Sequence, residues 1–404
     1  MDLHVKERAV VEAHLRDEVA ALALKASRFP GIDFAWVLRQ IAGYQAIERK
    51  LPSWYAQKGL EFPASLPLEQ CSSEQAAAYK RQLLSQTLAP SAGGPLHGAD
   101  LTGGLGVDAC FLSPLFETYD YVERQEGLCQ LARHNFTVLG RDNVRVLHQS
   151  AEDYLQQAAP LDFVFLDPAR RDGKGRKVAA LSDCEPDVLP LLPLLREKAR
   201  HVLLKLSPML DISLVLKQLP QTTQVHVVAV DNECRELLLL VDCQAATHVR
   251  PYCRTVNLWA GRPVQEFGFF LDEMGGFEPR IASTPGTWLY EPNAALMKSG
   301  GHGLTARELS LGKLHPNSQL YTGDSLWPDY PGRIFRVKEA LNPSGKDTRR
   351  LLTGAGYSVC VRNYPESPDE IRKKYKLKED PRRFLFATTL GDGRHVLLSC
   401  ERQD

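Results

Sequence analysis

Apolar residues recur every three to four positions along most of the first ninety residues, and this spacing predicts helices. We expect helices over Glu7–Leu24, Phe34–Arg49 and Ser72–Leu88. Pro30-Gly31 and Leu51-Pro52 interrupt the pattern after the first two. Ser72 and Gln75 have the spacing of a capping box at the start of the third helix.

From Ala92 to Asp242 the pattern changes to short apolar runs, and helical stretches separate the first five of them. This alternation predicts a doubly wound parallel sheet. Only Asn232–Arg235 joins the last two runs, and a parallel crossover needs a dozen residues or more. The last strand is therefore predicted to be antiparallel. The runs are Leu96–Leu101, Tyr119–Glu123, Val144–His148, Leu161–Asp167, His201–Leu206, Val225–Asp231 and Glu236–Val241.

Beyond Cys243 the chain becomes richer in Tyr, Trp, Gly and Pro, and short strands replace the earlier rhythm. A basic helix is expected over Pro368–Leu377. We expect an N-terminal helical region over 1–91, the α/β domain over 92–245, and α+β subdomains over 246–330 and 331–404. The expected strands are Gln265–Leu271, Trp288–Glu291, Ile334–Val337, Tyr357–Arg362, Arg383–Thr389 and His395–Cys400.

The composition is that of a globular protein, with 44% apolar and 24% charged residues in 404. Lys+Arg and Asp+Glu both number 49, which argues against a wholly basic nucleic-acid coat protein. The charge is uneven, because Pro331–Asp404 holds 16 basic and 10 acidic residues and so favours an anionic partner. Nine scattered cysteines without a CxxC pair, a charged start and no long apolar run indicate a cytoplasmic protein. We expect no metal, no membrane association and no obligate protein partner.

A glycine-rich segment, Asp100–Asp108, lies between a predicted strand and a predicted helix. Glycines there let backbone N–H groups and a helix N-terminus approach a ligand. A tight strand–helix turn also explains the segment. Gly104-x-Gly106-x-x-Ala109 fits the nicotinamide-dinucleotide fingerprint as well.

Acidic and polar residues follow the next three strands, at the sheet edge where ligands of such folds bind. Glu123 lies 19 residues after Gly104, where a carboxylate can accept both ribose hydroxyls. Ser150 and Ala151 follow the third strand, near the expected adenine edge, and Asp167–Arg171 follows the fourth. This ordered set is more specific than any one member.

Over about 92–242 the sequence resembles the class I S-adenosylmethionine-dependent methyltransferases. Thr102 stands where the usual glycine loop has its first glycine, and Glu123 matches the ribose-binding acid. The resemblance implies S-adenosyl-L-methionine as cofactor. It would be bound by Asp100, Thr102, Gly103, Gly104, Gly106, Glu123, Ser150 and Ala151.

Asp167-Pro168 resembles the start of the Asp/Asn-Pro-Pro-Tyr motif of enzymes that methylate exocyclic amines, with Ala169 and Arg170 in place of Pro and Tyr. The Asp167 carboxylate and the Pro168 carbonyl are the expected acceptors for the amine, and Pro168 adds no N–H. The aromatic residue that would stack on a flipped base is missing. Arg170 and Arg171 would clamp a phosphate, or form a solvated surface pair with Asp172.

The whole chain resembles a bacterial family in which this methyltransferase domain precedes a THUMP-like domain, THUMP being an RNA-binding module. The resemblance implies methylation of RNA, with tRNA or rRNA as substrate, and a ferredoxin-like subdomain before the THUMP-like one. The matching segments are Gln70–Glu74, Tyr79-Lys80, Asp167–Arg171, Lys205–Pro208, Glu291–Ala294, Arg362–Pro365 and Arg383–Thr389.

Three further features each have two interpretations. Lys205 ends the fifth strand and would face the substrate; otherwise it would cap the strand or pair with Asp211. Ser73 and Glu74 would contact the methionine end of the cofactor, or only cap their helix. The basic run would bind RNA phosphates, or form a solvated helix face; its members are Arg372, Lys373, Lys374 and Lys376.

Two other functions compete with RNA methylation. The changed Ala169-Arg170 pair is compatible with a non-catalytic RNA-binding protein whose methyltransferase domain only senses cofactor. A nicotinamide dehydrogenase is disfavoured by the terminal hairpin and by the Asp-Pro loop.

Overall fold

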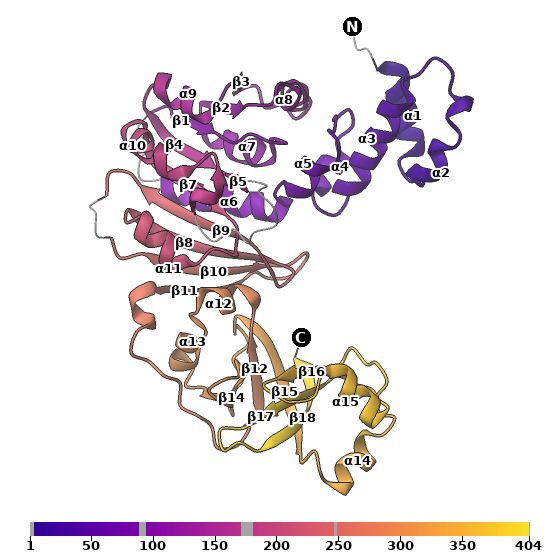
Figure 1. Ribbon diagram of the computed structural model, residues 1–404, viewed down its shortest axis with the longest axis vertical. Coiled ribbons are helices and arrows are strands. Elements are labelled where there is room, and N and C mark those ends of the chain that lie inside the picture. The colour runs from indigo at the N-terminus through magenta and orange to yellow at the C-terminus, as the bar shows by residue number, and fades with distance from the viewer. Residues whose placement is uncertain (1–3, 89–93, 171–180, 246–248, 404) are drawn as a thin grey trace. The chain divides into compact units, whose positions relative to one another are not determined.

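The computed structural model describes residues 4–88, 94–170, 181–245 and 249–403 (Figure 1). The helix expected over Glu7–Leu24 is two helices, α1 (Val5–His14) and α2 (Val19–Ala23). The chain turns between them, where the Asp17 N–H donates to the His14 carbonyl, and Glu18 has an extended backbone. Further helices follow: α3 (Phe34–Ile47), α4 (Pro52–Ala56), α5 (Ser65–Gln70) and α6 (Glu74–Leu88).

The start of α6 corrects the predicted capping box. Ser73, not Ser72, caps the helix, because its hydroxyl accepts from the Ala76 N–H at 3.3 Å. The Ser72 hydroxyl donates to Asp108 instead, and Ser72 is buried. The Ser72 oxygen in turn accepts from the Lys80 ammonium at 2.9 Å, so both its donor and its acceptor functions are used within this buried cluster.

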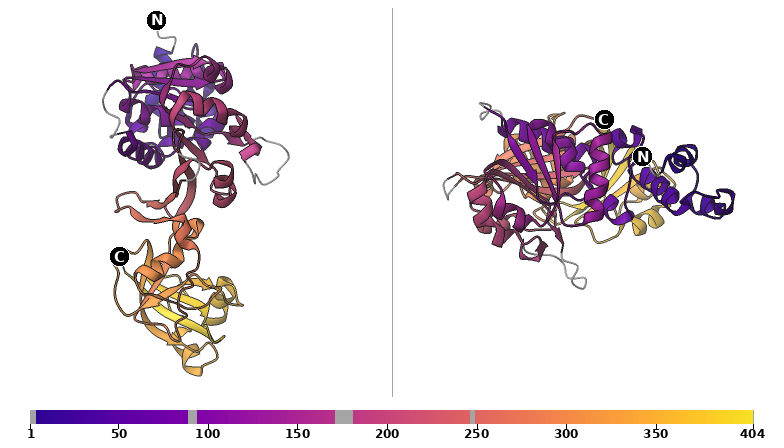
Figure 2. Two further views of the ribbon diagram at one scale, coloured as in Figure 1. Left: turned by 90° about the vertical axis from the view of Figure 1, so that its left-hand side faces the viewer. Right: turned by 90° about the horizontal axis from the view of Figure 1, so that it is seen from above.

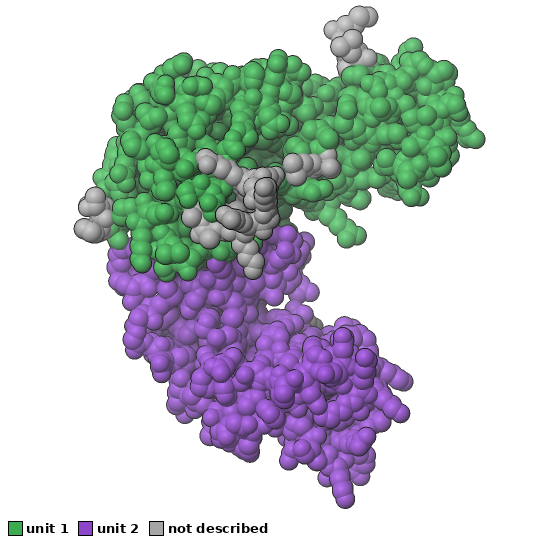
Figure 3. All heavy atoms as spheres, viewed as in Figure 1, with its two compact units in different colours: residues 1–223, 238–249 green, residues 224–237, 250–404 purple. Residues whose placement is uncertain are grey.

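The chain forms two compact units, coloured separately in Figure 3: residues 1–223 with 238–249, and residues 224–237 with 250–404. The large sheet has nine strands in the order β11-β10-β8-β9-β7-β4-β1-β2-β3. The predicted α/β fold is confirmed, and the sheet contains β10 and β11 in addition to the seven expected strands. Their bounds are β1 (His97–Asp100), β2 (Thr118–Glu123), β3 (Val144–His148), β4 (Leu161–Leu166), β7 (Ala199–Leu206), β8 (Thr222–Val230), β9 (Glu233–Asp242), β10 (Tyr252–Leu258) and β11 (Gln265–Phe270).

The expected antiparallel strand is formed by a tight hairpin. Only Asp231 and Asn232 join β8 to β9, with φ angles of 51° and 62°. Two successive residues with positive φ form the turn that matches the twist of antiparallel strands. The chain therefore reverses directly, and β9 takes its place between β8 and β7.

Helices lie on both faces of the parallel strands (Figure 2). They are α7 (Val107–Leu112), α8 (Glu126–Val138), α9 (Ala151–Gln157), α10 (Val188–Lys198) and α11 (Ile212–Gln218). Strand β1 pairs in parallel with β2 and with β4, so that Asp100 lies opposite Tyr121 and Phe165. This register brings the residues after β1, β2 and β4 to one edge of the sheet.

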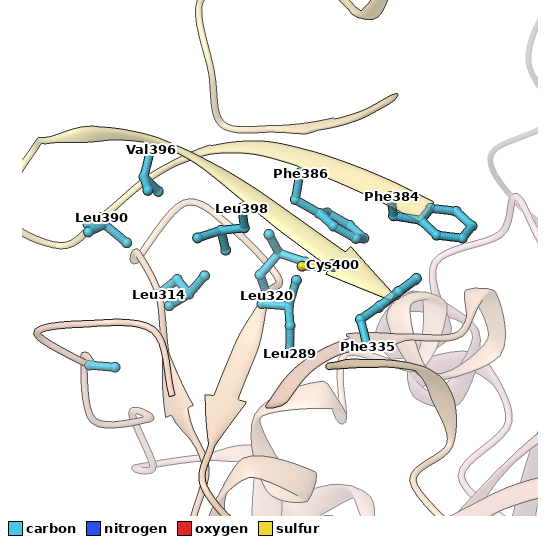
Figure 4. Close-up of a cluster of buried hydrophobic side chains, with 11 residues drawn as sticks. Leu289, Leu314, Leu320, Phe335, Phe384, Phe386, Leu390, Val396, Leu398 and Cys400 are labelled. Carbon is cyan, nitrogen blue, oxygen red and sulfur yellow. The ribbon is translucent and has the colours of Figure 1, made fainter. Parts of the chain in front are cut away.

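The second unit contains a seven-stranded sheet in the order β13-β14-β12-β15-β18-β17-β16. Its aromatic core includes Phe335, Phe384 and Phe386, which pack edge to face or stacked (Figure 4). The strands are β12 (Trp288–Pro292), β13 (Gly312–Lys313), β14 (Tyr321–Gly323), β15 (Gly332–Leu341), β16 (Ser358–Arg362), β17 (Arg383–Thr389) and β18 (His395–Gln403). The helices are α12 (Ala294–Ser299), α13 (His302–Glu308), α14 (Lys346–Leu352) and α15 (Pro368–Tyr375).

Within the described ranges, no helix has the length and apolarity to cross a membrane. The same ranges hold no group of three or more His, Cys, Asp or Glu side chains placed to bind a metal.

Candidate functional site

The glycine loop is held directly against the acid at the end of β2. The Gly104 N–H donates to one Glu123 carboxylate oxygen at 2.9 Å, and the Gln125 N–H donates to the other at 2.8 Å. A Cβ on Gly103 would lie 2.3 Å from the Tyr121 ring, and Gly106 has a φ of +83° where α7 begins. Glycine is therefore required here by close packing and by backbone conformation.

Thr102 connects the glycine loop to the Asp-Pro loop. Its hydroxyl accepts from the Asp167 N–H at 2.7 Å and lies 3.3 Å from an Asp100 carboxylate oxygen, to which it can donate. The Thr102 N–H donates to the same oxygen at 2.9 Å. A glycine, which the usual loop has at this position, would lack the hydroxyl that makes this link.

Asp100 is almost fully buried, with 1% of its surface exposed. Burial raises the pKa of its carboxyl to about 8, and the charges of Asp108 and Asp167 raise it further against the hydrogen bonds from Thr102. The carboxyl is therefore mainly protonated at neutral pH.

Sequence reasoning did not assign a role to a buried ionic cluster beside this loop, formed by Ser72, Lys80 and Asp108. The Lys80 ammonium, which is fully buried, lies 3.0 Å from Asp108 Oδ1 and donates to the Ser72 hydroxyl at 2.9 Å. Burial by itself would raise the pKa of Asp108, but the ammonium groups of Lys80 and Lys205 outweigh it and the pKa is lowered. The signal was present in the sequence, since Lys80 interrupts the apolar stripe of Ala76, Ala77, Leu83 and Leu84 on α6.

Lys205 continues this cluster to the Asp-Pro loop. Its ammonium lies 2.5 Å from Asp167 Oδ2 and 3.8 Å from Asp108 Oδ2. Asp167 is the more accessible of its two partners, because 34% of its side chain is exposed against 10% for Asp108. Lys205 thus joins a buried carboxylate to one that a substrate can reach.

The residues at this edge provide a donor and acceptor set that suits a nucleoside. A carboxylate that already accepts two N–H bonds retains lone pairs for a ribose diol, because each oxygen can accept more than one bond. Adding a Cβ at Gly104 would meet only the Thr102 carbonyl, at 3.7 Å, so this side of the loop has space. Asp100, Thr102, Gly103, Gly104, Gly106 and Glu123 therefore lie together.

Two other pairs of predicted cofactor residues have local roles. The Ser150 hydroxyl accepts from the Asp153 N–H and caps α9, in which Ala151 is buried. Ser73 caps α6, and the Glu74 carboxylate accepts from the Ser53 N–H at 2.8 Å. These bonds correspond to the simple capping interpretation of Ser73.

Of the two arginines of the Asp-Pro loop, Arg170 and Arg171, the structure describes the backbone of the first only. Ala169 and Arg170 form the short strand β5, which pairs with Cys184 and Glu185 of β6. Arg171 lies outside the described residues.

The basic run belongs to the second unit, on and after α15. Arg372 forms ion pairs with Asp369 at 3.6 Å and Glu379 at 3.3 Å, and Lys374 pairs with Glu366 at 2.8 Å. Lys373 and Lys376 are exposed, and Lys376 ends the helix with a φ of +50°. Half of the predicted basic run is thus paired with carboxylates of its own unit.

The strand order, with an antiparallel strand inserted between the fifth and sixth parallel positions, and the glycine loop facing an acid define a class I methyltransferase fold. Residues 288–331 match a family model described as a ferredoxin-like domain, and residues 332–402 match one described as THUMP domain-like. The crystal structure of a "putative methyltransferase from Porphyromonas gingivalis W83" is 30% identical, with a TM-score of 0.87 over 99% of this chain and 98% of that one. The chain belongs to the family of that protein, methyltransferases with a C-terminal THUMP-like domain.

Smaller proteins match part of the chain. An rRNA methylase from Streptococcus thermophilus is 15% identical, with a TM-score of 0.30 over 40% of this chain and 95% of its own. A human methyltransferase 10 domain containing protein is 12% identical, with a TM-score of 0.38 over 50% and 98%. Neither likeness bears on what this chain acts on. No curated protein matches the sequence.

Proposed function

We propose that this protein uses S-adenosyl-L-methionine to methylate an exocyclic amine of a base in structured RNA, with tRNA as the preferred substrate. The observation that carries the proposal is the hydrogen-bonded connection of Glu123, the glycine loop and Asp167 at one sheet edge. In this proposal Glu123 is the ribose acceptor and Asp167 the amine acceptor, and Gly104 and Thr102 of the same loop are hydrogen-bonded to them. The match to a THUMP domain-like model supports RNA as the substrate.

Each residue of this edge has a defined task. Glu123 accepts from the ribose hydroxyls, and the glycine loop lets the backbone approach the nucleoside. Asp167 and the Pro168 carbonyl accept from the two N–H groups of the target amine and thereby aim its lone pair. S-adenosyl-L-methionine supplies an activated methyl group when bound. The amine nitrogen loses a proton as its bond to the methyl group forms, and in this proposal the Asp167 carboxylate accepts that proton.

Lys205 acts in this proposal as a positioning residue. Its ammonium holds Asp167 Oδ2 at 2.5 Å, and the second ion pair with the buried Asp108 fixes the ammonium in turn. The Lys205 ammonium and the target amine both donate to the Asp167 carboxylate. When the substrate binds, the carboxylate must therefore accept from both groups at once. Lys205→Met should therefore alter the Michaelis constant for RNA as well as the turnover.

Calorimetric titration of S-adenosylhomocysteine tests the cofactor site. We expect Glu123→Gln to lose about 1.5–3 kcal/mol of binding free energy, the range for hydrogen bonds to a charged group. The 2′-deoxy analogue of the ligand should bind wild type more weakly than the parent, and Glu123→Gln, which has lost the charge, should discriminate less between the two. Glu126→Gln, an exposed glutamate three residues away, is the matched control. Equal discrimination by wild type and Glu123→Gln would remove Glu123 from the ribose site.

Transfer of a labelled methyl group to bulk tRNA tests catalysis. Asp167→Asn should abolish transfer while S-adenosylhomocysteine binds with unchanged affinity, because the carboxylate acts mainly in the transition state. Full transfer by this variant would refute the assigned role. Wild type that binds both cofactor and RNA but transfers no methyl group would instead support the cofactor-sensing, non-catalytic alternative.

A further inference from the structure

The second unit contains a cavity of about 330 Å³ that is separate from the residues assigned above. Its lining includes one acid, two arginines and several amides. The acid is contributed by β12, one arginine by β15 and the other by β16. The charged and amide residues on which the site depends are Glu291, Arg333, Arg362, Asn317, Gln319 and Asn363.

Two guanidinium groups share a single buried carboxylate in this cavity. Glu291 is 7% exposed, and one of its oxygens accepts from Arg333 while the other accepts from Arg362 at 2.9 and 2.6 Å. The three side chains therefore carry a net charge of +1. Only the carboxylate is buried, since 28% of the Arg333 side chain and 43% of the Arg362 side chain are exposed. The two guanidinium groups that line the cavity are therefore accessible to an anion, and their single net charge matches a monoanion.

The guanidinium groups retain donors for such a ligand. Arg333 donates its Nε–H and an Nη2–H to Glu291, and Arg362 directs its Nε–H and Nη2–H to Glu291 and its Nη1–H to the Val361 carbonyl. A guanidinium has five N–H groups, so these contacts leave part of each fork for a second acceptor. Arginine forks match the oxygen spacing of phosphate.

The remaining lining suits hydroxyl groups and does not suit bases. Among the described residues that line the cavity none is aromatic, so it offers no surface on which a base can stack. Asn317, Gln319 and Asn363 instead supply both donors and acceptors, which is what a sugar hydroxyl needs. A phosphodiester carries one negative charge, and this equals the net charge of the ionic group.

We propose that this cavity binds the ribose–phosphate backbone of an RNA strand, with a phosphodiester on Arg333 and Arg362 and a ribose hydroxyl on the amides. The proposal rests on the proposed function for its partner, but the site itself involves no residue of the methyltransferase edge. It predicts binding without base preference and with a preference for RNA over DNA.

Fluorescence titration of the full chain with a labelled single-stranded RNA, at several salt concentrations, tests the site. Arg362→Gln should weaken binding by about tenfold or more at low salt, as expected for the loss of a charge-assisted hydrogen bond. The dependence of log affinity on log salt should flatten by about 0.7, the value for one phosphate of a single strand. Arg336→Gln, on an exposed residue of the same strand as Arg333, should change neither quantity.

The sugar contact is tested with DNA of the same sequence and with adenosine monophosphate. Wild type should prefer RNA, and Asn317→Ala should reduce that preference. Equal affinities of Arg362→Gln and wild type for RNA would overturn the proposal. Tight binding of adenosine monophosphate without RNA binding would overturn it too, since it would identify a free nucleotide as the source of the phosphate. Unchanged binding of S-adenosylhomocysteine by Arg362→Gln separates this result from a failure of the proposed function.

Discussion

At the scale of single residues, Asp100 links the candidate site to pH. Burial raises the pKa of its carboxyl to about 8, whereas an unfolded chain has an ordinary aspartate near 4. Between about pH 4 and 8 the folded protein therefore keeps a proton on Asp100 that the unfolded chain has already released. The free energy of unfolding falls through this window as the pH rises, because the folded state keeps a proton that becomes harder to hold.

Asp100→Asn should remove this pH dependence while keeping a side-chain oxygen for the Thr102 N–H. We expect wild type to lose about 2–3 kcal/mol relative to the variant between pH 5 and pH 7, from 1.36 kcal/mol for each pH unit. Urea unfolding of both proteins at these pH values measures the difference. Asp142→Asn, on the loop before β3, should track wild type. Parallel pH profiles for Asp100→Asn and wild type would show that Asp100 ionises normally.

Some residues of the candidate site could be predicted from the local sequence pattern, and others could not. Glycines at Gly104 and Gly106, and acids at the ends of strands, follow from local patterns, and the parallel register then brings them together. The apolar stripe of α6 shows that Lys80 lies on the buried face, but its partner Asp108 is 28 residues away on another helix, so the periodicity does not identify the ion pair. The same reason explains Ser72, whose partner is decided by the packing of α6 on α7 and not by its place before a helix.

At the scale of elements, the strands of the parallel core were predictable because each is a short apolar run between turn residues. Val144–His148 of this core has the predicted bounds, and so does Arg383–Thr389 in the seven-stranded sheet. β10 was not predicted, and β11 was predicted in another subdomain. Which sheet a strand joins depends on residues far away in the sequence, so the local pattern does not show it. Strand formation is local in the sequence, whereas strand partnership is a property of the folded chain.

The hairpin between β8 and β9 gives a prediction at this scale. Asn232 has a φ of 62°, and its side-chain oxygen accepts from the Ala294 N–H at 2.8 Å. Asn232→Ala should lower the free energy of unfolding by about 2–3 kcal/mol, since it loses a hydrogen bond and adds left-handed backbone strain.

Asn232→Gly separates the two contributions, because glycine adopts a positive φ without strain. It should cost about 1 kcal/mol, the value of the lost hydrogen bond alone. Urea unfolding monitored by tryptophan fluorescence measures both variants against wild type. Equal losses for the alanine and glycine variants would show that the turn conformation carries no strain.

At the scale of the whole molecule, some of the basic side chains that make the C-terminal segment positive form ion pairs in the folded protein. Residues 331–404 have 16 basic and 10 acidic residues, but ion pairs with carboxylates of the same unit occupy Arg372 and Lys374. Charges that are already paired attract a phosphate less, because the two neighbouring signs largely cancel beyond a few ångströms. The number of charges is known from the sequence, but only the folded structure shows which of them form ion pairs.

The basic run is expected to recruit RNA through Lys373 and Lys376, and less through Lys374. Replacing the first two with alanine should weaken binding of bulk tRNA at low salt and flatten the salt dependence by about 1.4–1.8, from 0.7 to 0.9 for each phosphate contact. Lys374→Ala should have a smaller effect, because its Glu366 partner offsets the charge.

Filter-binding titrations at several salt concentrations measure these slopes. S-adenosylhomocysteine affinity should stay constant in each variant, since all three lysines belong to the second unit and the cofactor residues to the first. Superimposable RNA titrations for the double variant and wild type would make α15 an ordinary solvated helix, and the arginines of the Glu291 cavity would then be the remaining candidates for RNA recruitment.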